Sequence, residues 1–278
     1  MIGETVGKYQ VLAELGSGAM ANVYKVEEQP SKAQFAMKVL HPFLNESKSI
    51  VERFRRESKV IAALRHDHIV KFIDYVEEGE TFAFIMELID APTLEEILID
   101  TERVPEKFAV SLIIQLCSAL QLAHSFHIIH RDIKPSNIFV AQGRGVILTD
   151  FGFAKPLFGT ALTVDGAKLM GTPFYMSPEQ VTGEPTDPRT DVYQTGLLLY
   201  QLVTGRVPFA NKSTFEAITA RTKEQPEFTA EDKILISEEL VRRVLKATEV
   251  APAARYQSAQ EMGDDVELLH HSKRSTIS

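Results

Sequence analysis

The hydrophobic pattern of the chain changes at about residue 90, and this change constrains the fold more than any other feature of the sequence. Before it, short stretches rich in β-branched and aromatic residues predict strands at 9–15, 22–28, 34–40, 69–76 and 81–87. One helical stretch, at about 47–64, interrupts them. From Pro92 onward, helical spacing dominates. The sequence therefore predicts an α+β chain in which a small strand-rich part precedes a larger, mainly helical part.

Size and charge limit what this chain can bind. Its 278 residues, 44% of them hydrophobic, are enough for a sizeable core in one large or two medium domains. The formal net charge is −8, from 30 basic and 38 acidic residues. Because nucleic-acid binding depends on clustered Lys and Arg, we expect no nucleic-acid partner, and local features must hold any phosphate ligand.

The sequence also bears on the compartment in which the chain works. Cys117 is the only cysteine, so no disulfide forms within the chain, and its apolar helical surroundings predict a core residue. The N-terminus has no basic segment followed by an apolar run, and no stretch approaches ~18 consecutive apolar residues. We therefore expect a cytoplasmic chain, with residues 271–278 as a polar tail or the start of a linker.

A glycine-containing segment, LGSGAMANV at 15–23, lies between the first two predicted strands. Gly16 and Gly18 stand one residue apart, which allows a tight turn and lets backbone N–H groups approach a phosphate closely. The same pattern also fits an ordinary hairpin turn, so the segment taken alone leaves both interpretations open.

Two charged residues are expected in apolar surroundings. Alternation in the strand 34–40 puts Lys38 on the same side as Ala36 and opposite to Met37. Glu57 lies on the apolar face of the helical stretch, where burying an unpaired carboxylate would be costly. Lys38 either faces solvent or pairs with Glu57, and the pairing accounts for both residues at once.

The stretch HRDIKPSN, from His130 to Asn137, gathers polar and ionisable side chains too densely for a buried core. A second stretch, DFG, begins at Asp150, eighteen residues after Asp132, and SPE follows at 177–179. Each piece alone fits a solvated turn. The alternative is that the charges meet a ligand.

The order and spacing of six motifs match the protein-kinase signature: the G-x-G loop, Lys38, Glu57, HRDIKPSN, DFG and SPE. The chain resembles a protein kinase over about residues 9–270, and RFRRE, GTPFYMSPEQ and RYQSAQEM are similar to bacterial eukaryotic-like (Hanks-type) Ser/Thr kinases, which act in signalling. The resemblance implies a bilobal protein-kinase fold. Its N-lobe, 1–88, would hold a small antiparallel β-sheet and one main helix, and its larger C-lobe, 89–270, would be mainly helical and include the activation loop 150–179.

The resemblance implies an enzyme that transfers the γ-phosphate of ATP to Ser or Thr hydroxyls of protein substrates, with Mg²⁺ or alternatively Mn²⁺ as the metal. Lys38, held by Glu57, would bind the α- and β-phosphates. Asn137 and Asp150 would bind the metal, which prefers hard oxygen ligands.

Further roles follow from the same resemblance. Asp132 would accept the proton of the attacking hydroxyl, and Lys134 would steady the γ-phosphate. Lys134 and Thr172 together are associated with Ser/Thr rather than Tyr specificity. Backbone groups of Glu87 and Ile89 would bond adenine. The full set of implied ATP contacts is Leu15, Gly16, Ser17, Gly18, Ala19, Met20, Ala21, Val23, Ala36, Lys38, Met86, Glu87, Ile89 and Phe139.

Some residues are expected to support the site or to depart from the family. Ala21 stands in place of the third loop glycine, and Ala fits there unless φ is positive. Asp191 precedes an apolar helical run and is expected to cap it, and by the resemblance also holds the catalytic-loop backbone. The resemblance further implies a structural ion pair between Glu179 and Arg255, and a contact of Arg131 with a phosphorylated residue of the activation loop.

Two other functions compete with a protein kinase. A nucleotide-binding pseudokinase or scaffold is disfavoured because Lys38, Asp132, Asn137 and Asp150 are all present. A small-molecule phosphotransferase of related fold is disfavoured by the SPE segment and the Thr-containing loop at 171–180. Homodimerisation for autophosphorylation in trans, and membrane attachment through segments beyond residue 278, stay open.

The activation loop yields a first testable prediction. We expect autophosphorylation at Thr163, or secondarily at Thr160, because Arg131 pairs with a phosphate in kinases of this kind; Thr172 is the third candidate. Mass spectrometry after incubation with Mg·ATP locates the phosphate. An active enzyme in which Thr163 and Thr160 both stay unmodified would contradict the prediction.

Overall fold

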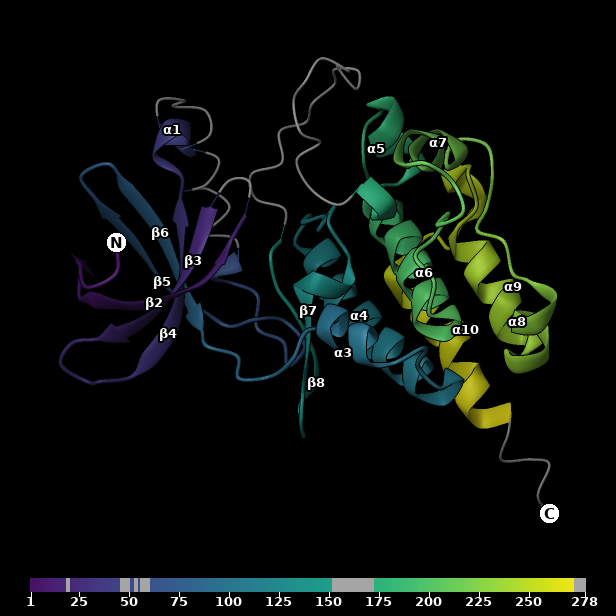
Figure 1. The fold of residues 1–278 in the computed structure, drawn as a ribbon, viewed down its shortest axis with the longest axis horizontal. Coiled ribbons are helices and arrows are strands. Elements are labelled where there is room, and N and C mark those ends of the chain that lie inside the picture. Colours follow the sequence, from purple (N-terminus) through teal and green to yellow (C-terminus); the bar gives the residue numbers. More distant parts are fainter. Residues whose placement is uncertain (19–20, 46–50, 53–54, 56–60, 152–172, 273–278) are drawn as a thin grey trace. The chain divides into compact units, whose positions relative to one another are not determined.

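The structure, a computed structural model, describes residues 1–18, 21–45, 51–52, 55, 61–151 and 173–272 (Figure 1). The chain divides into two compact units, of which the first is Met1–Asp90 and the second contains the described residues from Ala91 on. Several residues with expected roles lie outside the described residues: Ala19, Met20, Glu57, Thr160, Thr163 and Thr172.

The first unit is built on a six-stranded antiparallel sheet with the strand order β1-β2-β3-β4-β6-β5. A short helix, α1 (Pro42–Asn45), follows β4. The strands are β1 (Thr5–Val6), β2 (Tyr9–Ser17), β3 (Ala21–Glu28), β4 (Gln34–Leu40), β5 (Phe72–Glu78) and β6 (Thr81–Glu87).

The second unit is mainly helical and contains one two-stranded hairpin, β7 (Ile138–Ala141) with β8 (Gly145–Leu148). Short 3₁₀ turns lie at η1 (Pro135–Asn137), η2 (Pro173–Tyr175) and η3 (Pro252–Ala254). Its helices are α3 (Leu94–Asp100), α4 (Glu106–Ser125), α5 (Pro178–Thr182), α6 (Pro188–Thr204), α7 (Thr214–Ala220), α8 (Ala230–Leu235), α9 (Glu238–Ala247) and α10 (Ala259–Ser272).

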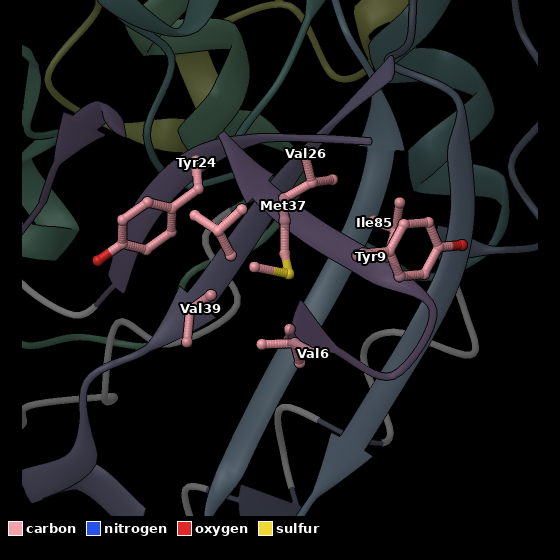
Figure 2. Packing of buried hydrophobic residues seen from close by; sticks show 9 residues of the cluster. Val6, Tyr9, Tyr24, Val26, Met37, Val39 and Ile85 are labelled. Atoms are coloured by element: carbon pink, nitrogen blue, oxygen red, sulfur yellow. The ribbon is translucent and has the colours of Figure 1, made fainter. Parts of the chain in front are cut away.

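Alternation along the strands separates the buried core face of the sheet from its opposite face. Met37, Val26 and Ile85 are fully buried in one cluster, which Figure 2 shows together with Tyr9 and its neighbours. Each such side chain contributes roughly 1.5–3 kcal/mol through burial. Lys38, one residue after Met37, therefore lies on the opposite face of β4.

Helices α4 and α10 lie side by side in the second unit, and α4 also contacts α6 and β8 (Figure 1). Among the described residues α4 is the one helix long and apolar enough, by length and composition, to cross a membrane. Half of that apolar stretch is buried inside the fold, and core helices commonly pass the same test. The apolar residues of α4 are thus accounted for by packing.

The start of α6 corrects one sequence-based prediction. The helix begins at Pro188, and its N-cap is Asp187, whose side chain accepts a hydrogen bond from the amide of Arg189. Asp191 is therefore not the cap but a fully buried residue inside the first turn. Proline is favoured at the first helical position because its missing N–H is not needed there, which explains the earlier start.

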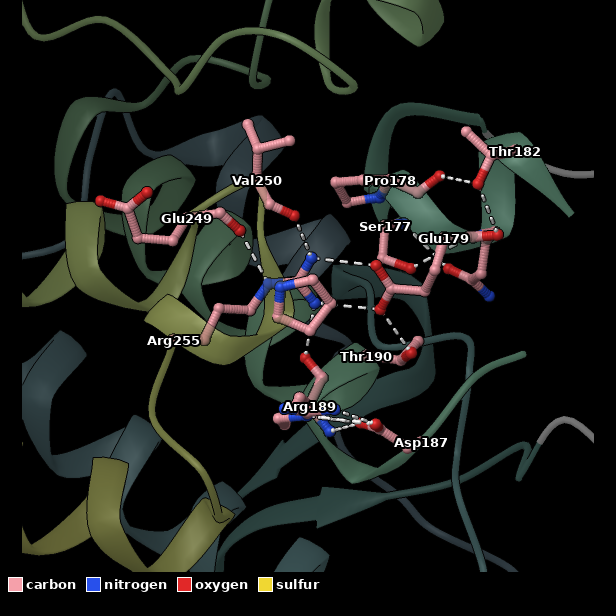
Figure 3. Close-up of polar contacts among 12 residues, drawn as sticks. Ser177, Pro178, Glu179, Thr182, Asp187, Arg189, Thr190, Glu249, Val250 and Arg255 are labelled. Carbon is pink, nitrogen blue, oxygen red and sulfur yellow. Dashed lines mark hydrogen bonds and ion pairs between the residues drawn. The ribbon is translucent and has the colours of Figure 1, made fainter. Parts of the chain in front are cut away.

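A buried ion pair joins α5 to the segment before α10 (Figure 3). Arg255 donates from Nη1 and Nη2 to the two carboxylate oxygens of Glu179, each at 2.9 Å. Thr190 adds a hydroxyl donor to the carboxylate at 2.6 Å. Further bonds from Arg255 reach the carbonyls of Glu249 and Val250. Burial alone would raise the pKa of Glu179, but the bonds from Arg255 and Thr190 outweigh it and lower the pKa.

Close packing between α6 and α9 gives a prediction about stability. A Cβ at Gly196 would lie 2.7 Å from Cβ of Ala247 and 2.8 Å from Cγ2 of Thr248. Overpacking costs about 1–3 kcal/mol, against about 1 kcal/mol gained in helix propensity. Gly196→Ala should therefore lower the free energy of unfolding, measured by urea denaturation. Gly263→Ala is the matched control, since its Cβ would lie 3.1 Å from Cβ of Cys117. Equal or greater loss in the control would contradict the prediction.

The ion pair gives a prediction with a defined pH dependence. Glu179→Gln leaves Arg255 buried without its counter-charge, so the free energy of unfolding at neutral pH should fall by about 3–5 kcal/mol. Because the folded-state pKa of Glu179 is lowered, the parent's advantage is present above the ordinary Glu pKa of about 4.3 and disappears as pH falls through the folded value.

Urea denaturation of both proteins at several pH values measures this difference. The control is Glu239→Gln, which removes an exposed pair with Arg242 and should cost less than about 1 kcal/mol. A Glu179→Gln deficit no larger than that of the control, or one that does not shrink on acidification, would refute the role of the buried charge.

Candidate active site

The segment 130–137, the expected catalytic loop, contains a buried, neutral histidine, His130. His130 is fully buried, and its Nε2 lies 2.8 Å from the carbonyl oxygen of Thr149. A carbonyl only accepts, so Nε2 carries the proton, and Nδ1 accepts a hydrogen bond from the amide of Asp132 at 3.2 Å. Burial lowers the pKa of His130 despite the nearby carboxylate of Asp191. The neutral ring thus fixes the backbone of Asp132.

The carboxylate of Asp191 holds the start of the same loop. It accepts hydrogen bonds from the amides of His130, at 2.8 Å, and Arg131, at 2.7 Å. His124 on α4 donates a third from Nε2 at 2.8 Å. Arg131 has a left-handed backbone with φ of 65°, which is unfavourable for a residue with a side chain. The carboxylate therefore stabilises a strained turn.

Two glutamines bond the carbonyl of Arg131 and extend this network. Gln180 on α5 donates to it at 2.9 Å, and Gln194 on α6 donates at 3.1 Å. Gln194 also donates to Oε1 of Gln180 and accepts from the amide of Ile133. Through these bonds the segment 177–180 (SPEQ) is joined to the catalytic loop. The Nε of Arg131 meanwhile donates to the hydroxyl of Thr186 at 3.0 Å.

Sequence reasoning missed His124, Gln180 and Gln194. A signal existed for Gln194, because an amide inside the apolar run of α6 must find a partner when it is buried. For Gln180 the capping-box spacing from Ser177 marked only its local bond, and not its bond to Arg131. No comparable signal marked His124, whose partner Asp191 is far away in the sequence.

The polar side chains of the catalytic loop converge. Lys134 Nζ lies 3.1 Å from Asp132 Oδ2. Asn137 donates from Nδ2 to the backbone carbonyl of Asp132, at 2.8 Å, and to its Oδ2, at 3.2 Å. Side chains of Asp132 and Lys134 each keep 18% exposure, enough to meet a ligand.

The hairpin β7–β8 sets the backbone positions of the two expected metal ligands. Asn137 directly precedes β7, and its carbonyl accepts from the amide of Thr149 at 2.9 Å and from its hydroxyl at 3.1 Å. Asp150 follows Thr149 and has a left-handed backbone, with φ of 56°. Register in the hairpin thus ties the backbone of Asn137 to the residue before Asp150.

The donor set of Asn137 and Asp150 fits a divalent cation. Because Nδ2 of Asn137 is used by Asp132, Oδ1 is the atom left to act as a ligand. Mg²⁺ is usually bound by one or two such oxygen ligands together with substrate phosphates and water. Among the residues that the structure describes, no group of three or more His, Cys, Asp or Glu side chains could hold a metal. A site completed by phosphate oxygens is consistent with both observations.

In the first unit, cross-strand pairing arranges the expected nucleotide contacts on one face. Val23 on β3 pairs with Lys38 on β4, and Ala36 pairs with Met86 on β6. The expected partner of Lys38, Glu57, lies outside the described residues.

The glycine-containing segment 15–23, called the glycine loop below, is held by hydrogen bonds from Ser17 and Gly18 to the start of β3. The Ser17 hydroxyl donates to Oδ1 of Asn22 at 2.8 Å, and the amide of Gly18 donates to the carbonyl of Ala21 at 2.9 Å. Ala21 is the first residue of β3 and is not among the residues with positive φ. Alanine at this position therefore carries no backbone strain.

Glu87, whose backbone is expected to contact adenine, is bonded to Lys71. Its amide donates to the carbonyl of Lys71 at 2.9 Å, and its carboxylate accepts from the amide of Lys71 at 2.7 Å. These bonds join the end of β6 to the residue before β5 and fix the backbone at Glu87.

Comparison with known proteins identifies the family. The model of the protein kinase domain matches residues 9–266. The chain is 32% identical to the serine/threonine-protein kinase PrkC of Bacillus subtilis over 99% of this chain. It is 35% identical to the serine/threonine-protein kinase PknB of Mycobacterium leprae over 95% of this chain. The chain spans 42% and 43% of the lengths of these two relatives.

Solved structures agree with this assignment. A crystal structure of the Mycobacterium tuberculosis PknI kinase domain is similar to this chain, with a TM-score of 0.76 and 26% identity. The match covers 96% of this chain and 97% of the PknI chain. The expected α+β protein-kinase fold and the expected resemblance to bacterial Ser/Thr kinases are thereby confirmed. The chain belongs to the protein kinase family, and its sequence is that of a serine/threonine-type kinase domain.

Proposed function

We propose that this domain transfers the γ-phosphate of ATP to Ser and Thr hydroxyls of proteins, with Asp132 as the group that receives the hydroxyl proton. The observation that carries the proposal is the convergence of Asp132, Lys134 and Asn137 within 3.2 Å. In phosphoryl transfer the protein mainly positions the reactants and stabilises charge, so such convergence is the relevant property.

The geometry supports different roles for Asp132 and Lys134, two neighbouring side chains of the catalytic loop. The backbone of Asp132 is fixed by His130, so its carboxylate can accept a proton without moving. Lys134 beside it would balance the negative charge of the transferred phosphoryl group. The left-handed turn at Arg131 directly precedes Asp132 and is stabilised by the carboxylate of Asp191.

Kinases use ATP with a divalent metal, and we assign Mg²⁺ to Asn137 and Asp150, with Mn²⁺ as a substitute. The metal, when bound, neutralises phosphate charge. Lys38 would bind the α- and β-phosphates, with Glu57 as its partner. Backbone groups of Glu87 and Ile89 would bond adenine. Val23, Ala36, Met86 and Phe139 would supply apolar contacts to the nucleotide.

The wider roles of the protein are part of the proposal as well. We assign nucleotide binding to residues 1–88, and catalysis and protein-substrate binding to residues 89–270. The domain would work in the cytoplasm and dimerise for autophosphorylation in trans.

Asp132→Asn tests the proposal directly. The amide cannot accept the proton, so transfer of labelled γ-phosphate to a generic protein acceptor should fall by about 10²–10⁴-fold. Binding of Mg·ATP, measured by calorimetry, and the unfolding midpoint should stay near those of the parent. The control is Asp264→Asn, an exposed carboxylate on α10. Transfer by Asp132→Asn close to that of the parent would refute the role of Asp132, and a parent that binds ATP without any transfer would favour a pseudokinase.

A further inference from the structure

Two successive residues, Leu40 at the end of β4 and His41 directly after it, contact the glycine loop. Leu40, the last residue of β4, pairs with Ala21, the first residue of β3. The next residue, His41, lies with Nε2 2.8 Å from the carbonyl oxygen of Gly18. Since a carbonyl can only accept, Nε2 of His41 must carry the proton and donate it. The bond needs no particular charge on the ring, because both the cation and one neutral tautomer carry this proton.

Both backbone polar groups of Gly18 are thus engaged within the first unit. Its amide donates to the carbonyl of Ala21, and its carbonyl accepts from His41. Gly18 is therefore held at both groups, to the start of β3 through Ala21 and to the residue after β4, His41. Because backbone groups of a glycine loop approach the phosphate closely, the placement of Gly18 bears on phosphate binding.

The position of His41 is itself well defined. Its carbonyl accepts from the amide of Leu44, which closes the first turn of α1. Its ring stacks on Phe43, with ring centroids 5.4 Å apart and an interplanar angle of 18°. Lys38 lies three residues earlier, on β4. A single backbone segment therefore carries Lys38 and the side chain that holds the loop.

We propose that His41 is a positioning residue that holds the carbonyl of Gly18 and thereby fixes this part of the phosphate-binding loop relative to strand β4, which carries Lys38. The inference rests on the proposed function of 15–23 as the phosphate-binding loop. His41 touches neither the nucleotide nor the reacting atoms in this role. It acts through the loop, in a fixed spatial relation to Lys38.

Three substitutions separate this role from general packing. His41→Leu removes the donor, and the Kd for Mg·ATP should rise about three- to tenfold, as expected for loss of one hydrogen bond. The kcat at saturating ATP should stay near that of the parent, since the loss is in nucleotide binding. His41→Gln places an amide N–H near the Nε2 position and should recover most of the affinity. Phe43→Leu removes the ring stack but keeps the donor, and should leave the Kd unchanged.

Hydrogen exchange in the nucleotide-free protein tests the tether without reference to ATP. Loss of the bond to the carbonyl of Gly18 should let the neighbouring bond from the Gly18 amide to Ala21 open more often. The amide of Gly18 should therefore exchange faster in His41→Leu than in the parent or in His41→Gln. Unchanged exchange and Kd in His41→Leu, or a His41→Gln that behaves like His41→Leu, would overturn the inference. A parent that binds no ATP would instead refute the proposed function, while the exchange rates still decide whether His41 holds the loop.

Discussion

The left-handed backbone of Arg131 is the constraint on which the geometry of the catalytic loop depends. A residue with a side chain in this conformation costs on the order of 1–3 kcal/mol. Hydrogen bonds to a charged group contribute about 1.5–3 kcal/mol each, so the amides of His130 and Arg131 on the buried carboxylate of Asp191 offset that cost. The strained conformation persists because several hydrogen bonds hold the turn in place. As a result, the backbone of Asp132 is positioned by bonds within the protein and does not need a ligand.

Three side chains in the first turns of α6 bind two other segments, the catalytic loop and the segment 177–180. Asp191 binds the catalytic loop, Gln194, one turn later, binds Arg131 and Gln180, and Thr190 binds Glu179. Residues three and four apart on a helix share a face, so the helix presents these groups at a fixed spacing. All are buried, and a buried polar group is costly unless it is bonded. These three side chains therefore link the SPEQ segment and the catalytic loop more strongly than any exposed contact would.

Local pattern was sufficient for much of the fold but not for the contacts between distant residues. The strands expected at 34–40 and 81–87 coincide with β4 and β6, because both are short apolar runs that contain β-branched or aromatic residues. The strand expected at 69–76 begins at Phe72 instead, since Ile69 and Val70 are apolar for burial in the core. The cap of α6 was misplaced because an Asp precedes either possible start, and the proline at 188 decides between them. Partners such as Gln180 and Arg131, forty-nine residues apart, cannot be paired from spacing alone.

Strand register, more than the choice of individual side chains, sets the distances within each unit. In the first unit, the pairing of Val23 with Lys38 and of Ala21 with Leu40 fixes the glycine loop relative to Lys38. In the second, the bonds from Thr149 to Asn137 continue the hairpin register up to Asp150. A slip of one residue turns every side chain of a strand to its other face. A lysine of the right chemistry, displaced by one position, would therefore enter the apolar cluster around Met37, where no phosphate could reach it.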